Sequence, residues 1–155
     1  MVTAMILAGG VGSRVGAECP KQFIEVFGKP ILAYTIEIYQ KNSQVEAIEI
    51  VCHEDWIDYL KKMIKKYDLS KVRWITQGGK TFQESVINGM KYLKDKLNMD
   101  DIVMIHYGAA PFSSQHIIQD GIEKCRKYGM SVSCTPCFQL MGSNDGNGKS
   151  KQWID

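Results

Sequence analysis

Short apolar runs alternate along this chain with longer segments whose apolar residues recur at helical spacing. The apolar runs, which we expect to form buried strands, lie at residues 2–7, 47–52, 72–75, 102–106 and 131–134. The segments expected to form helices lie at residues 31–39, 56–67, 81–97 and 114–128, the third with Val86, Ile87, Met90 and Leu93 facing inward. Strands that alternate with helices are typical of a mostly parallel sheet covered on both faces. The sequence therefore predicts a three-layer α/β/α fold of the Rossmann-like kind.

Length and composition predict one main domain. A chain of 155 residues can bury a hydrophobic core, and its net charge of +2 gives no indication of a nucleic-acid or membrane partner. The apolar run that ends at Ala8 is far too short to span a membrane, and no basic segment precedes it, so we expect no signal peptide. The five cysteines are odd in number and irregularly spaced, which favours reduced thiols and a cytoplasmic location.

A glycine-rich segment directly follows the first expected strand. It consists of Leu7, Ala8, Gly9, Gly10, Val11, Gly12, Ser13 and Arg14. Glycines allow backbone N–H groups to approach phosphate oxygens without a side chain in the way. Arg14 and Lys21 add positive charge, because arginine can bind phosphate through two parallel hydrogen bonds and lysine acts as a mobile point charge. The segment is therefore predicted to bind phosphates, with Arg14 and Lys21 as candidate catalytic residues.

Two further segments are expected at the same edge of the sheet, residues 77–85 and 106–113. Ligands of such sheets bind beyond the carboxyl ends of the strands, where these segments and the glycine-rich segment would meet. Two other interpretations of the glycines stay open. The Walker pattern is absent, and the dinucleotide pattern G-x-G-x-x-G is met at Gly10 and Gly12 but has Val15 at its third glycine. Dinucleotide binding and a purely structural turn therefore remain as alternatives.

The glycine-rich segment, followed by Pro20-Lys21-Gln22-Phe23, resembles the signature of a cytidylyltransferase family. That family contains 2-C-methyl-D-erythritol 4-phosphate cytidylyltransferase and ribitol-5-phosphate cytidylyltransferase. The spacing from Arg14 to the Pro-Lys-Gln motif matches the family, and this motif is more specific than glycines alone. Two more segments agree in order and position, Gly78-Gly79 through Ser85 and His106 through Phe112, so the resemblance extends over essentially the whole chain.

The resemblance implies a nucleotidyltransferase with the nucleotide-diphospho-sugar transferase fold. Such an enzyme would join CMP from CTP to a polyol or sugar phosphate, such as 2-C-methyl-D-erythritol 4-phosphate or ribitol 5-phosphate, and release pyrophosphate. Its products would enter isoprenoid biosynthesis or cell-wall polyol phosphates. Leu7 to Ser13, Gly79 and Ser85 would bind the nucleotide, and Arg14 and Lys21 would neutralise its phosphates. Mg²⁺ would bridge the phosphates, and no protein nucleophile is needed.

Three positions differ from the family pattern. Phe82 stands in the second segment where the family normally has arginine, and Tyr107 and Ala110 stand in the third where it normally has an acidic residue and arginine. Because magnesium favours carboxylate oxygens, Tyr107 in place of the acidic residue removes a metal ligand that the family pattern implies. Two alternatives therefore remain: a nucleotidyltransferase that uses another nucleotide or acceptor, and a catalytically impaired nucleotide-binding relative.

The C-terminal segment is polar and rich in turn-forming residues. Asn144-Asp145-Gly146 is typical of a hairpin tip. The resemblance implies that this hairpin begins a projecting arm that pairs two subunits, and that the family pattern continues beyond Asp155, which leaves the sheet incomplete at its C-terminal side. We therefore predict a nucleotide-binding α/β domain at residues 1–141, the start of a β-arm at residues 142–155, and a homodimer.

Overall fold

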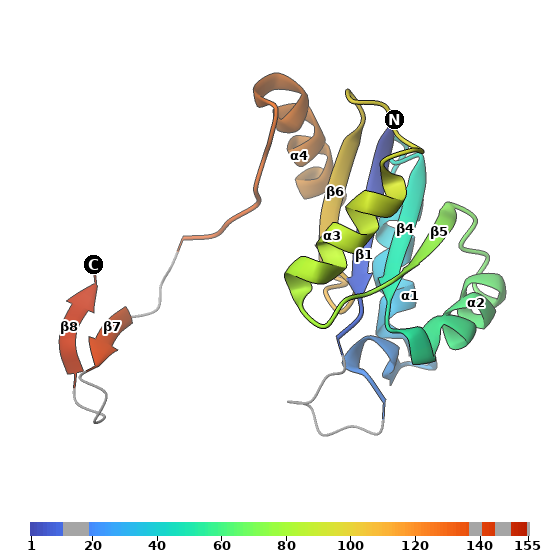
Figure 1. Ribbon diagram of the computed structural model, residues 1–155, viewed down its shortest axis with the longest axis horizontal. Coiled ribbons are helices and arrows are strands. Elements are labelled where there is room, and N and C mark those ends of the chain that lie inside the picture. The colour runs from blue at the N-terminus through green and yellow to red at the C-terminus, as the bar shows by residue number, and fades with distance from the viewer. Residues whose placement is uncertain (11–18, 137–140, 145–149, 155) are drawn as a thin grey trace.

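The computed structural model describes residues 1–10, 19–136, 141–144 and 150–154. Its centre is a parallel sheet of β1 (Val2–Ala8), β4 (Ala47–Cys52), β5 (Val72–Gln77) and β6 (Ile102–Tyr107), in the order β5-β4-β1-β6. β1 pairs with β4 on one side and with β6 on the other, which makes it a central strand (Figure 1). All four expected N-terminal strands are confirmed, as is the α/β class.

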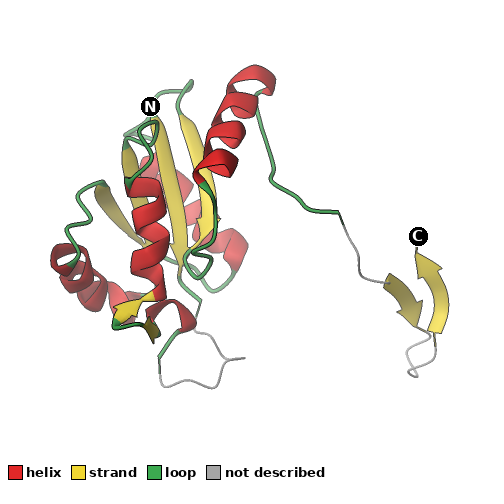
Figure 2. Ribbon diagram, turned by 180° about the vertical axis from the view of Figure 1, so that it is seen from behind, coloured by secondary structure: helices red, strands yellow, loops and turns green. Residues whose placement is uncertain are grey.

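Four helices of the described ranges cover the sheet, namely α1 (Ile31–Gln40), α2 (Ile57–Lys66), α3 (Phe82–Leu93) and α4 (Gln115–Tyr128). Side chains of α1, α2 and α4 share one buried cluster with alternate residues of β1 and β4, whereas α3 packs on the opposite face. Figure 2 shows the same layers from behind. The three-layer arrangement is thus confirmed. Among the described residues, no helix is both long and apolar enough to cross a bilayer.

The two faces of β1 explain why this strand is apolar at every position except Thr3. Val2, Ala4 and Ile6 point into the larger cluster, while Met5 and Leu7 point toward α3. A strand in the middle of a parallel sheet is covered on both faces and therefore has no solvent-facing positions. Its carboxyl end is consequently held firmly at the point where the glycine-rich segment begins.

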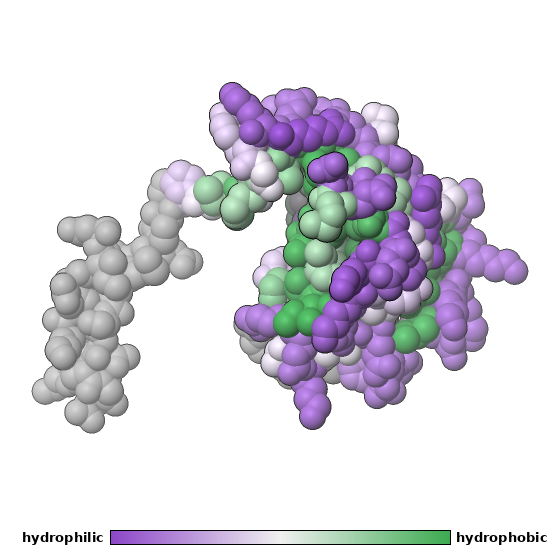
Figure 3. Space-filling model, turned by 45° about the horizontal axis from the view of Figure 1, so that its top comes forward, coloured by the Kyte–Doolittle hydropathy of each residue, from purple (hydrophilic) through white to green (hydrophobic). Residues whose placement is uncertain are grey.

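The α3 face is less fully covered than the sequence predicts. Leu93 is buried at 1% exposure, but Ile87 and Met90, which were expected to face inward, are 50% and 44% exposed. On the neighbouring strand β6, Ile105 is 47% exposed. In the described part of the chain α3 alone packs on this face, so β6 and one side of α3 keep apolar surface in contact with solvent (Figure 3).

The prediction of a fifth strand at residues 131–134 is wrong. These residues are exposed and lie outside the sheet, and Val132 is 76% exposed. The hydroxyl of Ser131 donates a hydrogen bond of 2.7 Å to the carbonyl of Gly121, so the segment runs beside α4 and does not pair with β6. A short alternating run becomes a strand only where a neighbouring strand accepts its hydrogen bonds.

The expected C-terminal hairpin is present as β7 (Met141–Asn144) and β8 (Ser150–Ile154), which pair antiparallel. Its tip falls between the two strands, at residues 145–149, outside the described residues. In Figure 1 the hairpin stands away from the α/β body.

Candidate active site

Lys21 is carried by a short 3-10 turn, η1 (Lys21–Phe23), that is anchored in the protein core. Phe23 is 3% exposed, and its ring stacks on Trp56 with centroids 4.7 Å apart and an interplanar angle of 14°. The ring of Tyr59 meets Phe23 edge-on at 5.3 Å. Lys21 itself is exposed. The turn therefore holds the exposed Lys21 on a rigid base beside the start of the glycine-rich segment.

Gln22 joins this turn to the start of the glycine-rich segment. Its side chain is buried, and the amide Nε2 donates to the carbonyl of Ala8 at 2.7 Å and to the carbonyl of Gly10 at 2.8 Å. A glutamine amide has two N–H donors, and here both are used. Lys21 and the peptide groups of residues 8–10 are consequently fixed relative to each other.

The second segment meets the first at Gly9. A Cβ added to Gly9 would lie 3.6 Å from the Oγ of Ser85 and 3.8 Å from the Cα of Gly78. Ser85 is buried at 6% exposure; its Oγ accepts a hydrogen bond of 3.0 Å from the N–H of Gly79 and donates one of 2.9 Å to the carbonyl of Thr81. Three of the predicted nucleotide-binding residues are thus brought together.

The second segment closes through a capping arrangement at the start of α3. The N–H of Glu84 donates to Thr81 Oγ1 at 3.1 Å, and the carboxylate of Glu84 accepts from the N–H of Lys80 at 2.7 Å. The backbone of Gly79 lies so close to Glu84 that an added Cβ would be 2.3 Å from the Cβ of Glu84. Only glycine fits at position 79, and the positive end of the α3 dipole lies at the same edge of the sheet.

The third segment is hydrogen-bonded to the end of β1. The N–H of Gly108 donates to the carbonyl of Leu7 at 2.8 Å, and the buried hydroxyl of Thr35 donates to the carbonyl of Gly108 at 2.9 Å. A Cβ at Gly108 would lie 3.0 Å from both the Leu7 carbonyl and Leu32 Cδ1. All three segments therefore converge on the carboxyl end of β1, as the sequence predicted.

His106 connects the two ends of the third segment. Its Nε2 lies 2.9 Å from Ser113 Oγ, and its ring meets that of Tyr39 edge-on at 5.2 Å. Burial lowers the pKa of His106, so the imidazole is neutral near pH 7. This histidine holds the loop in place by hydrogen bonding and packing.

Two aromatic side chains stand at this edge of the sheet on the α3 face. The rings of Phe82 and Tyr107 are 5.4 Å apart, with 45% and 61% of these residues exposed. Phe82 begins α3 and Tyr107 ends β6, so their contact joins the second segment to the end of β6. Neither supplies a charge.

The sequence model of the IspD family, described as 2-C-methyl-D-erythritol 4-phosphate cytidylyltransferase, matches residues 2–149. This chain belongs to the IspD family. A ribitol-5-phosphate cytidylyltransferase of Lacticaseibacillus paracasei is 37% identical over 155 residues, covering 100% of this chain and 66% of that relative. One of Vibrio parahaemolyticus is 39% identical over 149 residues, covering 94% and 63%.

Other relatives are named, like the family model, for 2-C-methyl-D-erythritol 4-phosphate. A 2-C-methyl-D-erythritol 4-phosphate cytidylyltransferase of Clostridium novyi is 44% identical over 130 residues, covering 83% of this chain and 54% of that relative. The crystal structure of 4-diphosphocytidyl-2C-methyl-D-erythritol synthase from Anaerococcus prevotii has the same fold, with a TM-score of 0.77 at 24% identity, covering 100% of this chain and 63% of that one. This chain thus spans about two thirds of the length of the ribitol-phosphate relatives.

The structure describes only part of the predicted IspD-family site. Leu7, Ala8, Gly9, Gly10, Lys21, Gly79 and Ser85 are described, whereas Val11, Gly12, Ser13 and Arg14 lie outside the described residues. Gln22 and Thr35 were not predicted as site residues. The Pro-Lys-Gln motif contained Gln22, but hydrophobic periodicity gives no sign that a glutamine is buried between an exposed lysine and a core phenylalanine.

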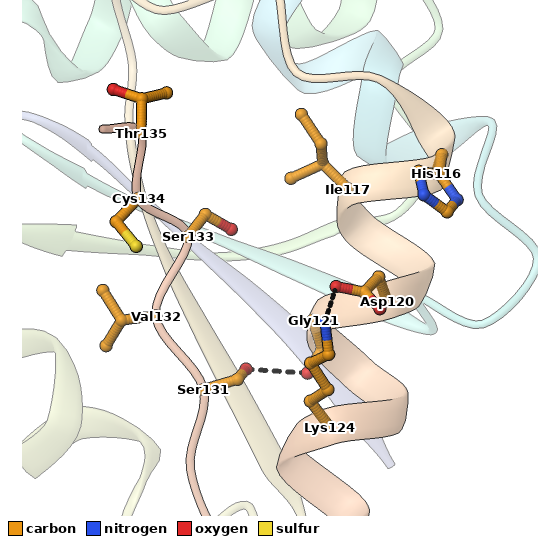
Figure 4. Close-up of a pocket in the computed structure, with 10 residues that line it drawn as sticks. All are labelled: His116, Ile117, Asp120, Gly121, Lys124, Ser131, Val132, Ser133, Cys134 and Thr135. Carbon is orange, nitrogen blue, oxygen red and sulfur yellow. Dashed lines mark hydrogen bonds and ion pairs between the residues drawn. The ribbon is translucent and has the colours of Figure 1, made fainter.

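A separate groove of about 660 Å³ lies between α4 and residues 131–135 (Figure 4). Its polar side chains include His116, Asp120 and Lys124, and the last two form an ion pair of 2.7 Å. No residue of the three converging segments lines it. The groove is therefore distinct from the candidate active site.

Proposed function

We propose that this chain binds CTP at the carboxyl end of β1 and transfers CMP from it to a polyol phosphate. The observation that carries the proposal is the joining of Lys21 to the glycine-rich segment through the two hydrogen bonds of Gln22. Peptide N–H groups and a nearby ammonium are suited to phosphate oxygens. Ribitol 5-phosphate is the first acceptor to test, because relatives named for it match the full length of this chain.

The proposed reaction needs no covalent enzyme intermediate. A phosphate oxygen of the acceptor attacks the α-phosphorus of CTP, the bond from that phosphorus to the bridging oxygen breaks, and pyrophosphate leaves with the electron pair. Negative charge builds on the α-phosphoryl and bridging oxygens, so catalysis depends on positioning and on neutralising that charge. Lys21 and Arg14 are proposed for this role, and residues 7–13, Gly79 and Ser85 for holding the nucleotide.

The described residues form no magnesium site by themselves, without substrate phosphates. Among them, no group of three or more His, Cys, Asp or Glu side chains could hold a metal ion. At the edge of the sheet, Glu84 already accepts from Lys80 and Glu54 from the Gln77 amide, while position 107 is a tyrosine. Magnesium usually binds through one or two carboxylates together with substrate phosphates. We therefore propose Mg²⁺ only as an ion that accompanies CTP, and we assign it no step.

Two assays test the function. Calorimetric titration with CTP, with UTP, GTP and ATP for comparison, measures binding. Pyrophosphate release from CTP in the presence of ribitol 5-phosphate or 2-C-methyl-D-erythritol 4-phosphate measures transfer. Preference for CTP with turnover of one acceptor supports the proposal, and a folded chain that binds no nucleotide contradicts it.

The aromatic pair Phe82–Tyr107 favours a second candidate, a nucleotide-binding protein without catalysis. Both rings are uncharged, whereas the charge that builds on phosphates during transfer is stabilised by cations or hydrogen-bond donors. Binding of CTP without turnover of any acceptor would support this candidate. A cytoplasmic location and a homodimer formed through the β7–β8 hairpin stay predictions, and analytical ultracentrifugation with and without residues 141–155 tests the second.

A further inference from the structure

We propose that Gln22 is a positioning residue that aims the first peptide groups of the glycine-rich segment at the phosphates and fixes their distance from Lys21. The inference rests on the proposed nucleotide binding. Gln22 does not itself reach the ligand in this scheme, because its two N–H groups are already bound to the carbonyls of Ala8 and Gly10.

The direction of a carbonyl determines the direction of the N–H that follows it. In a trans peptide the C=O and N–H groups lie in one plane and point in opposite directions, and the described part of the chain has no cis peptide. Since Gln22 holds the carbonyl of Ala8 toward itself, the N–H of Gly9 points away from Gln22. A segment of small residues without this restraint can rotate its peptides freely.

The same hydrogen bonds remove an electrostatic obstacle. Carbonyl oxygens carry partial negative charge, and an unrestrained carbonyl in this segment could turn toward an anionic ligand. The carbonyl of Ala8 ends β1, and the carbonyl of Gly10 lies two residues further on. Gln22 binds both at 2.7 and 2.8 Å, from a side chain that is 2% exposed, so both oxygens are turned toward the protein.

Gln22 also links these peptides to the ammonium group. Lys21, Gln22 and Phe23 share one turn, in which Phe23 is held by Trp56 and Gln22 by the glycine-rich segment. Neighbouring residues thus connect the exposed lysine to two rigid partners. Loss of the Gln22 hydrogen bonds therefore changes the distance between the peptide N–H groups and Lys21, so that they no longer contact the same triphosphate together.

The test is Gln22→Met, which keeps the length of the side chain and removes both donors without adding charge. The matched control is Gln40→Met. The Gln40 amide also holds two backbone groups, donating to the carbonyl of Asp68 at 2.8 Å and accepting from the N–H of Lys71 at 3.2 Å, but at the amino end of the sheet. We expect Gln22→Met to weaken CTP binding about tenfold or more, and Gln40→Met to change it less than about twofold at a similar loss of stability.

A double-mutant cycle with Lys21→Met separates positioning from simple destabilisation. If Gln22 acts by fixing the position of Lys21 relative to the glycine-rich segment, the fold-loss of CTP affinity in the combined variant is smaller than the product of the two single fold-losses. Unchanged CTP affinity in Gln22→Met, an equal loss in Gln40→Met, or multiplicative losses in the cycle would each overturn the inference. Should Gln22→Met not fold, Gln22→Asn and Gln40→Asn, which shorten the amide side chain without adding charge, are compared in the same way.

A readout without ligand distinguishes this inference from the proposed function. Amide hydrogen exchange at Gly9 and Gly10 is measured by NMR in the unchanged chain, Gln22→Met and Gln40→Met. Exchange that is faster only in Gln22→Met supports the restraint on the peptides, and equal rates overturn it. If the unchanged chain binds no CTP, the proposed function fails while this measurement still decides whether Gln22 orients the segment.

Discussion

The hydroxyl of Thr76 donates a hydrogen bond of 2.6 Å to the carboxyl group of Glu49, which lies completely buried in the sheet beneath α3. The second carboxyl oxygen of Glu49 has no hydrogen-bond partner among the described residues. Burial raises the pKa of Glu49 to about 7, although the bond from Thr76 opposes the shift. A carboxyl group in this setting is protonated in the folded chain at mildly acidic pH.

Stability should therefore fall as pH rises from about 4.5 to about 7, the interval between the ordinary and the folded pKa of Glu49. In that interval the unfolded chain releases the proton freely and the folded chain retains it, so unfolding is favoured by up to about 3 kcal/mol. Glu49→Gln should remove this decrease, measured by urea unfolding at a series of pH values. The exposed Glu123→Gln serves as control, and a decrease that persists in Glu49→Gln contradicts the prediction.

Lys21→Ala should weaken CTP binding by about tenfold or more and leave the free energy of unfolding nearly unchanged. The ammonium would lose charge-assisted hydrogen bonds to phosphate, whereas the exposed side chain contributes little to packing. Calorimetric titration and urea unfolding measure the two quantities. Lys62→Ala, an exposed lysine on α2, controls for net charge. Equal losses in both variants would show that Lys21 acts only through the overall charge.

Gly79→Ala should destabilise the chain by about 1–3 kcal/mol and disturb the second segment, because the new methyl group would overlap the Cβ of Glu84. The contrasting variant is Gly121→Ala within α4, where the nearest atoms lie at an ordinary 3.8 Å. That variant should gain up to about 1 kcal/mol from helix propensity. Thermal unfolding of both variants checks the opposite signs, and two shifts of the same sign contradict the close approach.

Thr35→Val should cost about 1–2 kcal/mol, because it leaves the buried carbonyl of Gly108 without its hydrogen bond while keeping the shape of the side chain. The loss should be local, with faster amide exchange in residues 108–113 than in β1. Val45→Thr, which adds a hydroxyl at another buried position, controls for polarity in the core. Unchanged exchange in the third segment would show that Thr35 does not hold it.

The strands and helices that pack on the sheet were predictable because their apolar periodicity reflects burial. β4 has the predicted bounds, and α1 begins at the predicted residue behind Pro30. The segment at residues 131–134 was mispredicted because a short alternating run says nothing about an available partner strand. Ile87 and Met90 follow helical periodicity correctly, but whether a second layer covers them depends on tertiary packing that one sequence does not display.

The site was predictable at the level of loops and motifs. Lys21 and the glycines of the first segment were identified from residue type and position, Gly79 and Ser85 from the family resemblance, and the structure brings Gly9 and Ser85 together. The role of Gln22 was not predictable, since it depends on the direction of one buried side chain toward carbonyls more than ten residues earlier in the chain. Hydrogen-bond partners of this kind follow from the folded backbone and not from local pattern.

The stacking of Phe23 on Trp56 has a thermodynamic consequence for Lys21. Because the backbone of the lysine is fixed by the same core that holds α2, only the torsions of its own side chain remain to be ordered when a ligand arrives. The conformational entropy that Lys21 loses on binding then corresponds to roughly 2 kcal/mol for one lysine side chain. A substitution at Trp56, outside the three converging segments, would loosen that base and raise the entropic cost of ligand capture.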